Sequence, residues 1–276
     1  MHFSAEGRAA ISGMLVRKRA ENGPIHDHVW RYPAIPDIES RLPSAGAVIE
    51  WARLLCSVGP DTKGPPEMRE SPIGSFLLRR AAAPTLGVLA AYLIFTVVAL
   101  GWHRWDPLWF AWIGERYSDL APGGDTGYDG QFVYYIARYG LDSLSHLDNP
   151  AYRLQRIGYP LAVWALSAGQ PALMPWVMFA INLAAIVVTT RLLSVWLSSQ
   201  GLSAWYSLLY AGYVGTFMAY SRDLTEPLAF ALVAGGMLAW LRRRVGWAVV
   251  WLAFAALTKE ITLLFVFGIV AVEILD

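Results

Sequence analysis

The chain has 276 residues, of which 56% are hydrophobic and 16% are charged, and its formal net charge is +1. Its single cysteine, Cys56, excludes an internal disulfide and a cysteine-based zinc site. A near-neutral charge without a basic, aromatic-rich stripe argues against a nucleic-acid partner. The apolar residues gather in blocks instead of alternating, which is typical of a membrane protein.

The first part of the chain differs from the rest. Residues 1–80 are rich in Pro, Arg and Glu, and we expect a poorly ordered cytoplasmic segment there, ahead of a transmembrane domain over 81–276. One amphipathic helix is predicted over residues 45–58. No apolar stretch follows Met1, so the sequence does not read as a signal peptide. Met68 is an alternative start, directly ahead of the first apolar block.

The apolar blocks predict membrane helices, because a span needs about 20 mostly apolar residues. Residues 83–102 supply them without a charge. Further spans are predicted over 172–190, 204–220, 224–241 and 247–275. Lys259 and Glu260 interrupt the last block, which is therefore either one long helix or two short helices that meet there. The expected fold is all-α and polytopic, with about five or six membrane segments.

Arginines next to the spans predict the orientation, since short cytoplasmic connections carry an excess of positive charge. They are Arg79, Arg80, Arg191 and the cluster Arg242 to Arg244. If all of them are cytoplasmic, the long loop over residues 103–170 faces the exterior. We therefore expect an integral protein of a bacterial inner (plasma) membrane, in contact with its lipids and with the polar loop facing the periplasm or exterior.

The external loop contains a helical pattern that begins at Asp129. Its aromatic and apolar residues are spaced as on one face of a helix, at Phe132, Tyr135, Ile136 and Tyr139. Such a stripe suits an interfacial helix, or packing on the tops of the spanning helices. Asp129 then stands where an N-cap residue stands, and capping is one sufficient explanation of it. Asp125 is likewise explained as a turn residue.

Three segments resemble the GT-C superfamily, the membrane glycosyltransferases that use polyprenyl-phosphate sugars. One is residues 128–132, Tyr-Asp-Gly-Gln-Phe, and another is residues 149–169, with two arginines and a Tyr-Pro. The third, over residues 221–265, is similar to paired segments of bacterial cell-surface glycopolymer proteins and of the GPI mannosyltransferase that adds the second mannose. Lys259 stands where those relatives have Arg, so a point charge replaces a bidentate contact. The family generally has more helices, which implies an amino-terminal portion of a longer protein.

The resemblance implies glycosyl transfer from a polyprenyl-phosphate sugar donor to a glycan, lipid or protein acceptor of the cell envelope. Asp129 would be the base that takes a proton from the acceptor hydroxyl, or a ligand of a divalent cation, Mg or Mn, with Asp125 as a second catalytic carboxylate. Charge on the leaving phosphate needs Arg, Lys or that cation. The residues expected to contact substrate are Tyr128, Gln131, Arg153, Arg156, Arg222, Glu226 and Lys259.

Ordinary structural roles compete with these assignments. Arg153 and Arg156 are equally explained as solvated charges or lipid contacts, and Glu226 as an acid in the first turn of a helix that Pro227 begins. Lys259 and Glu260 are equally explained as a polar turn at the membrane surface.

A different class of function is a transporter or assembly subunit for envelope polymers. An enzyme predicts that Asp129, Arg156, Glu226 and Lys259 converge at one outer cavity, whereas a transporter predicts polar groups near the bilayer midplane.

Overall fold

The computed structural model describes residues 82–275, and every regular element in that range is a helix, which confirms the all-α prediction. The chain divides into two units, and the second, residues 57–276, holds all the described residues. The predicted polar segment 1–80, its helix over 45–58 and the alternative start at Met68 lie outside the described residues.

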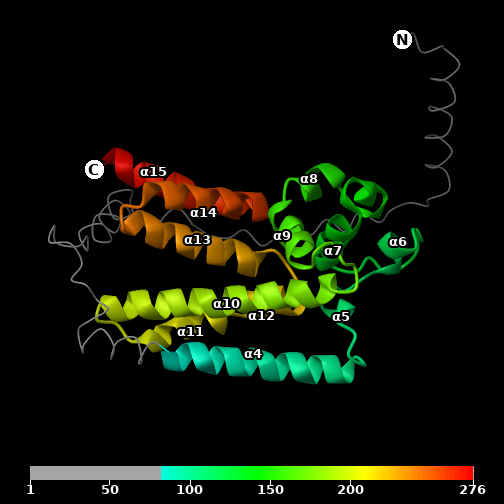
Figure 1. Ribbon diagram of the computed structural model, residues 1–276, viewed down its shortest axis with the longest axis horizontal. Coiled ribbons are helices and arrows are strands. Elements are labelled where there is room, and N and C mark those ends of the chain that lie inside the picture. The colour runs from blue at the N-terminus through cyan, green and yellow to red at the C-terminus, as the bar shows by residue number, and fades with distance from the viewer. Residues whose placement is uncertain (1–81, 276) are drawn as a thin grey trace, which may run out of the picture. The chain divides into compact units, whose positions relative to one another are not determined.

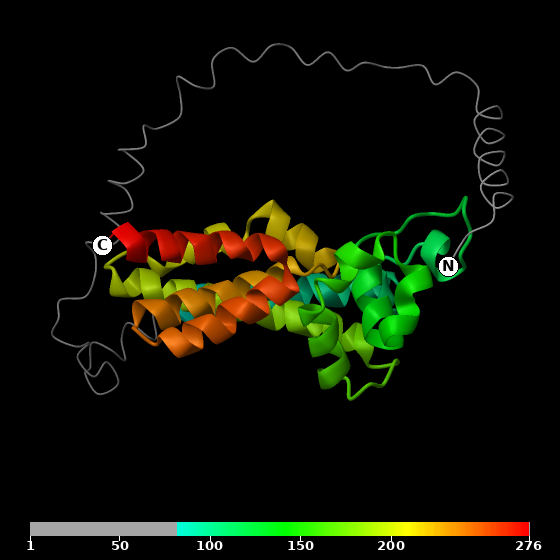
Figure 2. The same cartoon turned by 90° about the horizontal axis from the view of Figure 1, so that it is seen from above.

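Five longer helices of the described range run alongside one another (Figure 1, Figure 2). They are α4 (Ala82–Trp102), α10 (Met174–Ser199), α13 (Glu226–Leu241), α14 (Val245–Thr258) and α15 (Leu263–Leu275). By length and composition, α4 and α10 qualify as candidate membrane spans, while α13 and α14 are shorter apolar helices. The predicted spans over 83–102 and 172–190 correspond to α4 and α10.

The connection between α4 and α10 folds into short helices that gather at one end of the longer ones (Figure 1). They are α5 (Leu108–Ala111), α6 (Glu115–Ser118), α7 (Gly130–Tyr139), the 3-10 helix η2 (Gly140–His146), α8 (Pro150–Leu154) and α9 (Gly158–Leu166). This connection is the predicted external loop, and it carries most of the polar residues discussed below.

The prediction of an interfacial helix in this connection is wrong in one respect. Helix α7 does begin directly after Asp129, but residues 130–137 are all buried, whereas an interfacial helix exposes one face. Helices α9 and α10 and the η2 segment pack around it. Of the predicted stripe, only Tyr139 is exposed. The other residues of the stripe pack on neighbouring helices, which is the second role predicted for the stripe.

Residues 204–220 do not form the single predicted span. The chain there forms η3 (Ala204–Ser207), α11 (Leu208–Ala211) and α12 (Val214–Ser221). Tyr213 is extended, with φ −65° and ψ 131°, and follows a glycine, Gly212, so the helical hydrogen bonding stops between α11 and α12. Tyr220 of α12 lies in the core, where Tyr92 of α4 packs edge-on against it, with the two ring centres 5.0 Å apart.

The last apolar block, residues 247–275, forms two helices and not one long helix, which is the second of the two arrangements predicted for it. Helix α14 ends at Thr258, Lys259 is extended with φ −157°, and the short η4 (Glu260–Thr262) leads into α15. Both charges therefore lie at a junction between helices and not inside one. The hairpin of α13 and α14 packs closely because Gly236 has no side chain: a Cβ there would lie 2.8 Å from the Cγ of Leu252.

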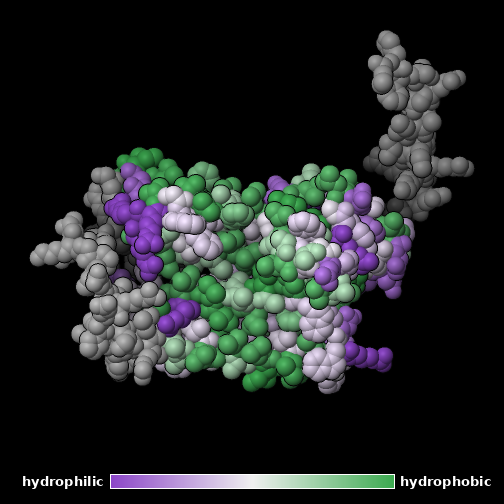
Figure 3. Space-filling view, viewed as in Figure 1, coloured by the Kyte–Doolittle hydropathy of each residue, from purple (hydrophilic) through white to green (hydrophobic). Residues whose placement is uncertain are grey.

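Much of the apolar side-chain surface of these helices is exposed. Large exposed residues include Ile94 and Val98 of α4 and Val249 and Phe254 of α14. Figure 3 shows polar residues gathered toward the two ends of the described part, with a mainly apolar surface between them. A contiguous apolar surface of this extent marks a contact with lipid or with another apolar partner.

Candidate functional site

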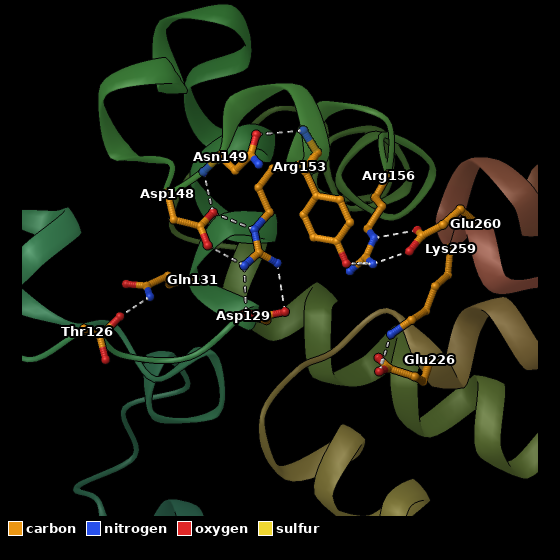
Figure 4. Close-up of polar contacts among 11 residues, drawn as sticks. Thr126, Asp129, Gln131, Asp148, Asn149, Arg153, Arg156, Glu226, Lys259 and Glu260 are labelled. Carbon is orange, nitrogen blue, oxygen red and sulfur yellow. Dashed lines mark hydrogen bonds and ion pairs between the residues drawn. The ribbon is translucent and has the colours of Figure 1, made fainter. Parts of the chain in front are cut away.

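The candidate site is built around Asp129, which lies at the N-cap position of α7 but does not cap it. Its backbone is helical, with φ −60° and ψ −26°, and its side chain makes no capping hydrogen bond. Both carboxylate oxygens instead accept hydrogen bonds from the Arg153 guanidinium, at 2.8 and 2.9 Å (Figure 4). Because paired bonds of this kind are strong and directional, the contact fixes the orientation of the carboxylate.

Arg153 is in turn held by a second carboxylate. Its Nε and Nη2 donate to the two oxygens of Asp148, each at 2.8 Å, and its guanidinium lies 4.2 Å from the ring centre of Phe132. Helix α8 places it there: Asn149 accepts a hydrogen bond from the backbone of Tyr152 and so starts the helix. The Arg153 guanidinium lowers the pKa of the Asp148 carboxyl below its ordinary value.

A second arginine, Arg156, joins the start of α9 to the junction between α14 and α15. Arg156, just ahead of α9, donates from Nε to Glu260 at 2.7 Å and also bonds to the hydroxyl of Tyr152. The Arg156 guanidinium lowers the pKa of the Glu260 carboxyl. Next to Glu260, Lys259 pairs with Glu226 at the start of α13 (Figure 4). The first of these ion pairs joins residues 104 positions apart in the sequence, and the second joins residues 33 positions apart.

Five of these charged residues line one pocket: Asp129, Arg153, Arg156, Glu226 and Lys259. Asp129, Arg156, Glu226 and Lys259 therefore converge, as predicted for an enzyme. The pocket encloses about 20 Å³. That space admits a water molecule but not a sugar, so the ion pairs close the pocket in this conformation.

A larger cavity of about 700 Å³ runs beside α13 and meets the polar pocket at Glu226, which lines both. Its walls are mainly apolar residues of α10 and α13, such as Leu193, Phe230 and Met237, with Tyr213 from the segment ahead of α12. We call this cavity the apolar groove. Its wall extends along α13 as far as Leu241, a helix of 16 residues or roughly 24 Å.

Two of the predicted site residues hold the loop instead of lining the pocket. Gln131 is fully buried, and its amide accepts from the backbone N–H of Gly114 at 3.1 Å and donates to the Thr126 carbonyl at 2.7 Å. It therefore has no surface left for substrate. Asp125 accepts a hydrogen bond from the indole of Trp112 at 3.3 Å and does not line the pocket. Its backbone carbonyl also accepts a hydrogen bond from the backbone N–H of Arg116 at 3.0 Å.

The remaining two predicted residues, Arg222 and Tyr128, do not line the pocket. The guanidinium of Arg222 stacks on Trp112, 3.8 Å from the ring centre, and burial lowers its pKa. Tyr128 is exposed and faces the same indole, with ring centres 6.5 Å apart. Arg222, Trp112 and Tyr128 thus form an aromatic and cationic surface that lies beside the closed pocket and not within it.

Two carboxylates that complete the ion pairs were not among the predicted site residues. Asp148 precedes the Asn-Pro that starts α8, and Glu260 follows Lys259. The only sequence signal for Glu260 was a pair of charges inside an apolar block, which is costly unless each charge has a partner. Asp148 gave no signal, because acids before an Asn-Pro turn are common in loops.

The metal role predicted for Asp129 stays a prediction. In this conformation both oxygens of Asp129 accept hydrogen bonds from Arg153. Within residues 82–275, moreover, no three His, Cys, Asp or Glu side chains are grouped as metal ligands. The positive charge beside Asp129 is a guanidinium.

Comparison of the chain with protein-family models, with curated proteins and with solved structures found no match.

Proposed function

We propose that the chain is a membrane glycosyltransferase of the GT-C type, which transfers a sugar from a polyprenyl-phosphate donor to an acceptor of the cell envelope. The observation that carries the proposal is the meeting of an ionic pocket and an apolar groove at Glu226. A lipid-linked phosphate has the same two parts, an apolar chain and a charged head. The three sequence segments that resemble the superfamily supply the choice of reaction.

In this proposal the described helices lie in a bacterial inner membrane. Helices α4 and α10 cross it, and the shorter α13, α14 and α15 cross with their charged ends at the two surfaces: Arg242 to Arg244 at one, Lys259 and Glu260 at the other. Their exposed apolar residues then face lipid, where they cost nothing. The positive cluster is cytoplasmic and the site is external.

The polyprenyl chain of the donor occupies the apolar groove, and its phosphate lies at the Glu226 end. There it competes with the Glu226 carboxylate for Lys259, whose flexible side chain follows the phosphate. The phosphate has to displace a carboxylate because each of the three cations, Arg153, Arg156 and Lys259, is already paired with a carboxylate. Donor binding thus opens the pocket that the ion pairs close.

Asp129 is the proposed general base. It accepts the proton of an acceptor hydroxyl, the hydroxyl oxygen forms a bond to the anomeric carbon, and the bond from that carbon to the phosphate oxygen breaks. Polyprenyl phosphate leaves with the electron pair, and its charge is balanced by Lys259 and Arg156. Arg153 acts through Asp129 by orienting it. The surface of Arg222, Trp112 and Tyr128 is suited to stacking on a sugar ring.

Mass spectrometry of envelope glycans and glycolipids in cells lacking the protein tests the proposal. We expect one glycosylated species to disappear, wild-type protein to restore it, and Asp129→Asn at equal abundance not to restore it. A transporter or assembly subunit predicts another result: the species would be made and would accumulate on the wrong side of the membrane. Restoration by Asp129→Asn would contradict the enzymatic proposal.

A further inference from the structure

A second group of polar residues lies beneath the ionic pocket, centred on Asp223 in the turn between α12 and α13. Its side chain is fully buried, and its backbone is in the left-handed region with φ 49°, which is uncommon for a residue other than glycine. Within the described residues no cation pairs with it, because the neighbouring Arg222 stacks on Trp112. An ionised carboxylate in such a place is destabilising, because burial removes the water that would solvate its charge and no cation replaces that water.

Asn182 of α10 donates a hydrogen bond to this carboxyl group. Its Nδ2 donates to Asp223 Oδ1 and to the carbonyl of Leu224, both at 3.1 Å. Two acceptors on one side fix the orientation of the amide, so that its oxygen lies on the other side. That oxygen, Asn182 Oδ1, and the second oxygen of Asp223, Oδ2, are both buried without a hydrogen-bond partner.

The other neighbour is Tyr159 of α9, whose hydroxyl contacts Asp223. A hydroxyl has one hydrogen, and this one is donated to the carbonyl of Met178 at 2.8 Å. Toward Asp223 the Tyr159 oxygen is therefore an acceptor. Asp223 therefore meets one donor, Asn182 Nδ2, and one acceptor, the Tyr159 oxygen. An ionised carboxylate, which only accepts, leaves that acceptor unmatched, whereas a protonated carboxyl group supplies the missing donor.

We propose that Asp223 is a neutral carboxylic acid in the folded protein, whose O–H group bonds to Tyr159 while its other oxygen accepts from Asn182, so that it ties α9, α10 and the α12–α13 turn together. These are the segments next to Arg156 and Glu226, so Asp223 is a positioning residue for the site. Burial raises the pKa of the Asp223 carboxyl well above its ordinary value, as a neutral acid requires. The titratable groups that face it are the hydroxyls of Tyr159 and Tyr220. The inference holds whichever reaction the site performs.

Infrared spectroscopy of the purified protein at neutral pH tests the protonation directly. A carboxylic acid has a C=O stretching band above the amide I band, and a carboxylate has none there. The difference between the spectra of wild type and Asp223→Asn is expected to contain one such band, which shifts slightly in D₂O. Other protonated acids cancel in this difference. Absence of the band would overturn the proposal.

Two substitutions test the tie between the segments. Asp223→Asn places an amide with both a donor and an acceptor in the same space, so thermal stability close to wild type is expected. Asp223→Ala removes the group and leaves Asn182 and Tyr159 unmatched, so a large loss of stability or of folded yield is expected. If Asp223→Asn were as damaging as Asp223→Ala, the carboxylate form would be the required one and the proposal would be wrong.

Discussion

At the residue scale, the ion pairs of the pocket determine how the protein responds to acid. Pairing with Arg156 lowers the pKa of Glu260 in the folded state, while the unfolded chain keeps an ordinary glutamate pKa of about 4.3. The pair therefore stabilises the fold fully above that ordinary value. Its contribution is lost as the pH falls through the lowered pKa, because the carboxylate then takes up a proton.

Glu260→Gln is expected to remove this pH dependence. Near neutral pH the variant unfolds at a lower temperature than wild type, because Arg156 loses its charged partner. The difference should shrink as the pH falls below about 4, where wild type also loses the charge. Thermal unfolding in detergent at several pH values measures it. Asp142→Asn, at an exposed acid that has no ion pair among the described residues, is the matched control. A difference that stays constant with pH would contradict the assignment.

Asp129 illustrates why such pairs are hard to predict from sequence. Its position at the start of α7 was predictable from the periodicity of the residues after it, and the structure agrees. Its partner was not predictable, because Arg153 lies 24 residues away across η2 and α8. A helix pattern shows which residues share a face, but it holds no information on which distant charge meets them. The sequence alone is therefore equally consistent with a cap, a role that the Asp129 side chain does not have in the structure.

At the element scale, the start of α7 lies directly against the α12–α13 turn. A Cβ on Gly130 would lie 2.3 Å from the backbone oxygen of Arg222, so no larger residue fits without movement of the backbone. This contact places Asp129 next to the turn that carries Arg222, Asp223 and Glu226. A glycine is thus required at position 130 because the backbone of Arg222 lies so close, and not because the backbone conformation of Gly130 excludes other residues.

Gly130→Ala is therefore expected to destabilise the protein by about 1–3 kcal/mol, the usual range for overpacking. Gly87→Ala in α4 is the control, because no atom lies within 4 Å of its added Cβ. That change is expected to be neutral or to stabilise by up to about 1 kcal/mol, since alanine favours a helix more than glycine does. Equal unfolding temperatures for the two variants would contradict the packing described for α7.

The apolar groove provides a second test at this scale. Ala234 of α13 lines the groove, and Ala234→Trp fills part of it. If the groove holds the lipid chain of the donor, the variant should have a KM for polyprenyl-phosphate sugar raised about tenfold or more, as expected for the loss of about 1.4 kcal/mol of binding. Ala253→Trp, at an exposed alanine of α14 outside the groove, is expected to behave as wild type. Equal KM values for both variants would show that the groove does not bind the donor.

The long helices were predictable because a run of about twenty apolar residues is typical of a membrane-spanning helix. Residues 83–102 predicted α4 almost to the residue. The breaks were harder: the segment over 204–220 has the composition of a span, yet the chain turns at Gly212 and Tyr213 so that Tyr220 can enter the core. Composition measures how apolar a segment is, whereas the break is decided by packing between helices distant in sequence.

At the scale of the whole molecule, the proposed orientation can be measured with cysteine labels. In a Cys56→Ser background, Leu141→Cys reports on the site end and Leu202→Cys on the opposite end, since both residues are exposed. We expect a membrane-impermeant thiol reagent to label Leu141→Cys in intact cells, and Leu202→Cys only after the inner membrane is permeabilised. The reverse result would put the site in the cytoplasm and contradict the proposed side of the reaction.

The central claim is that Asp129 is the base of a sugar transfer from a polyprenyl-phosphate donor. The most direct measurement compares purified wild type, Asp129→Asn and Asp125→Asn at equal amounts, following transfer of a labelled sugar from that donor. Asn cannot take up the proton, so Asp129→Asn should be at least about 100-fold slower. Its unfolding temperature should stay close to wild type, because Arg153 keeps Asp148 as a charged partner. Asp125→Asn should transfer nearly as wild type does, because Asp125 lies outside the pocket. Transfer at the wild-type rate by Asp129→Asn would contradict the account.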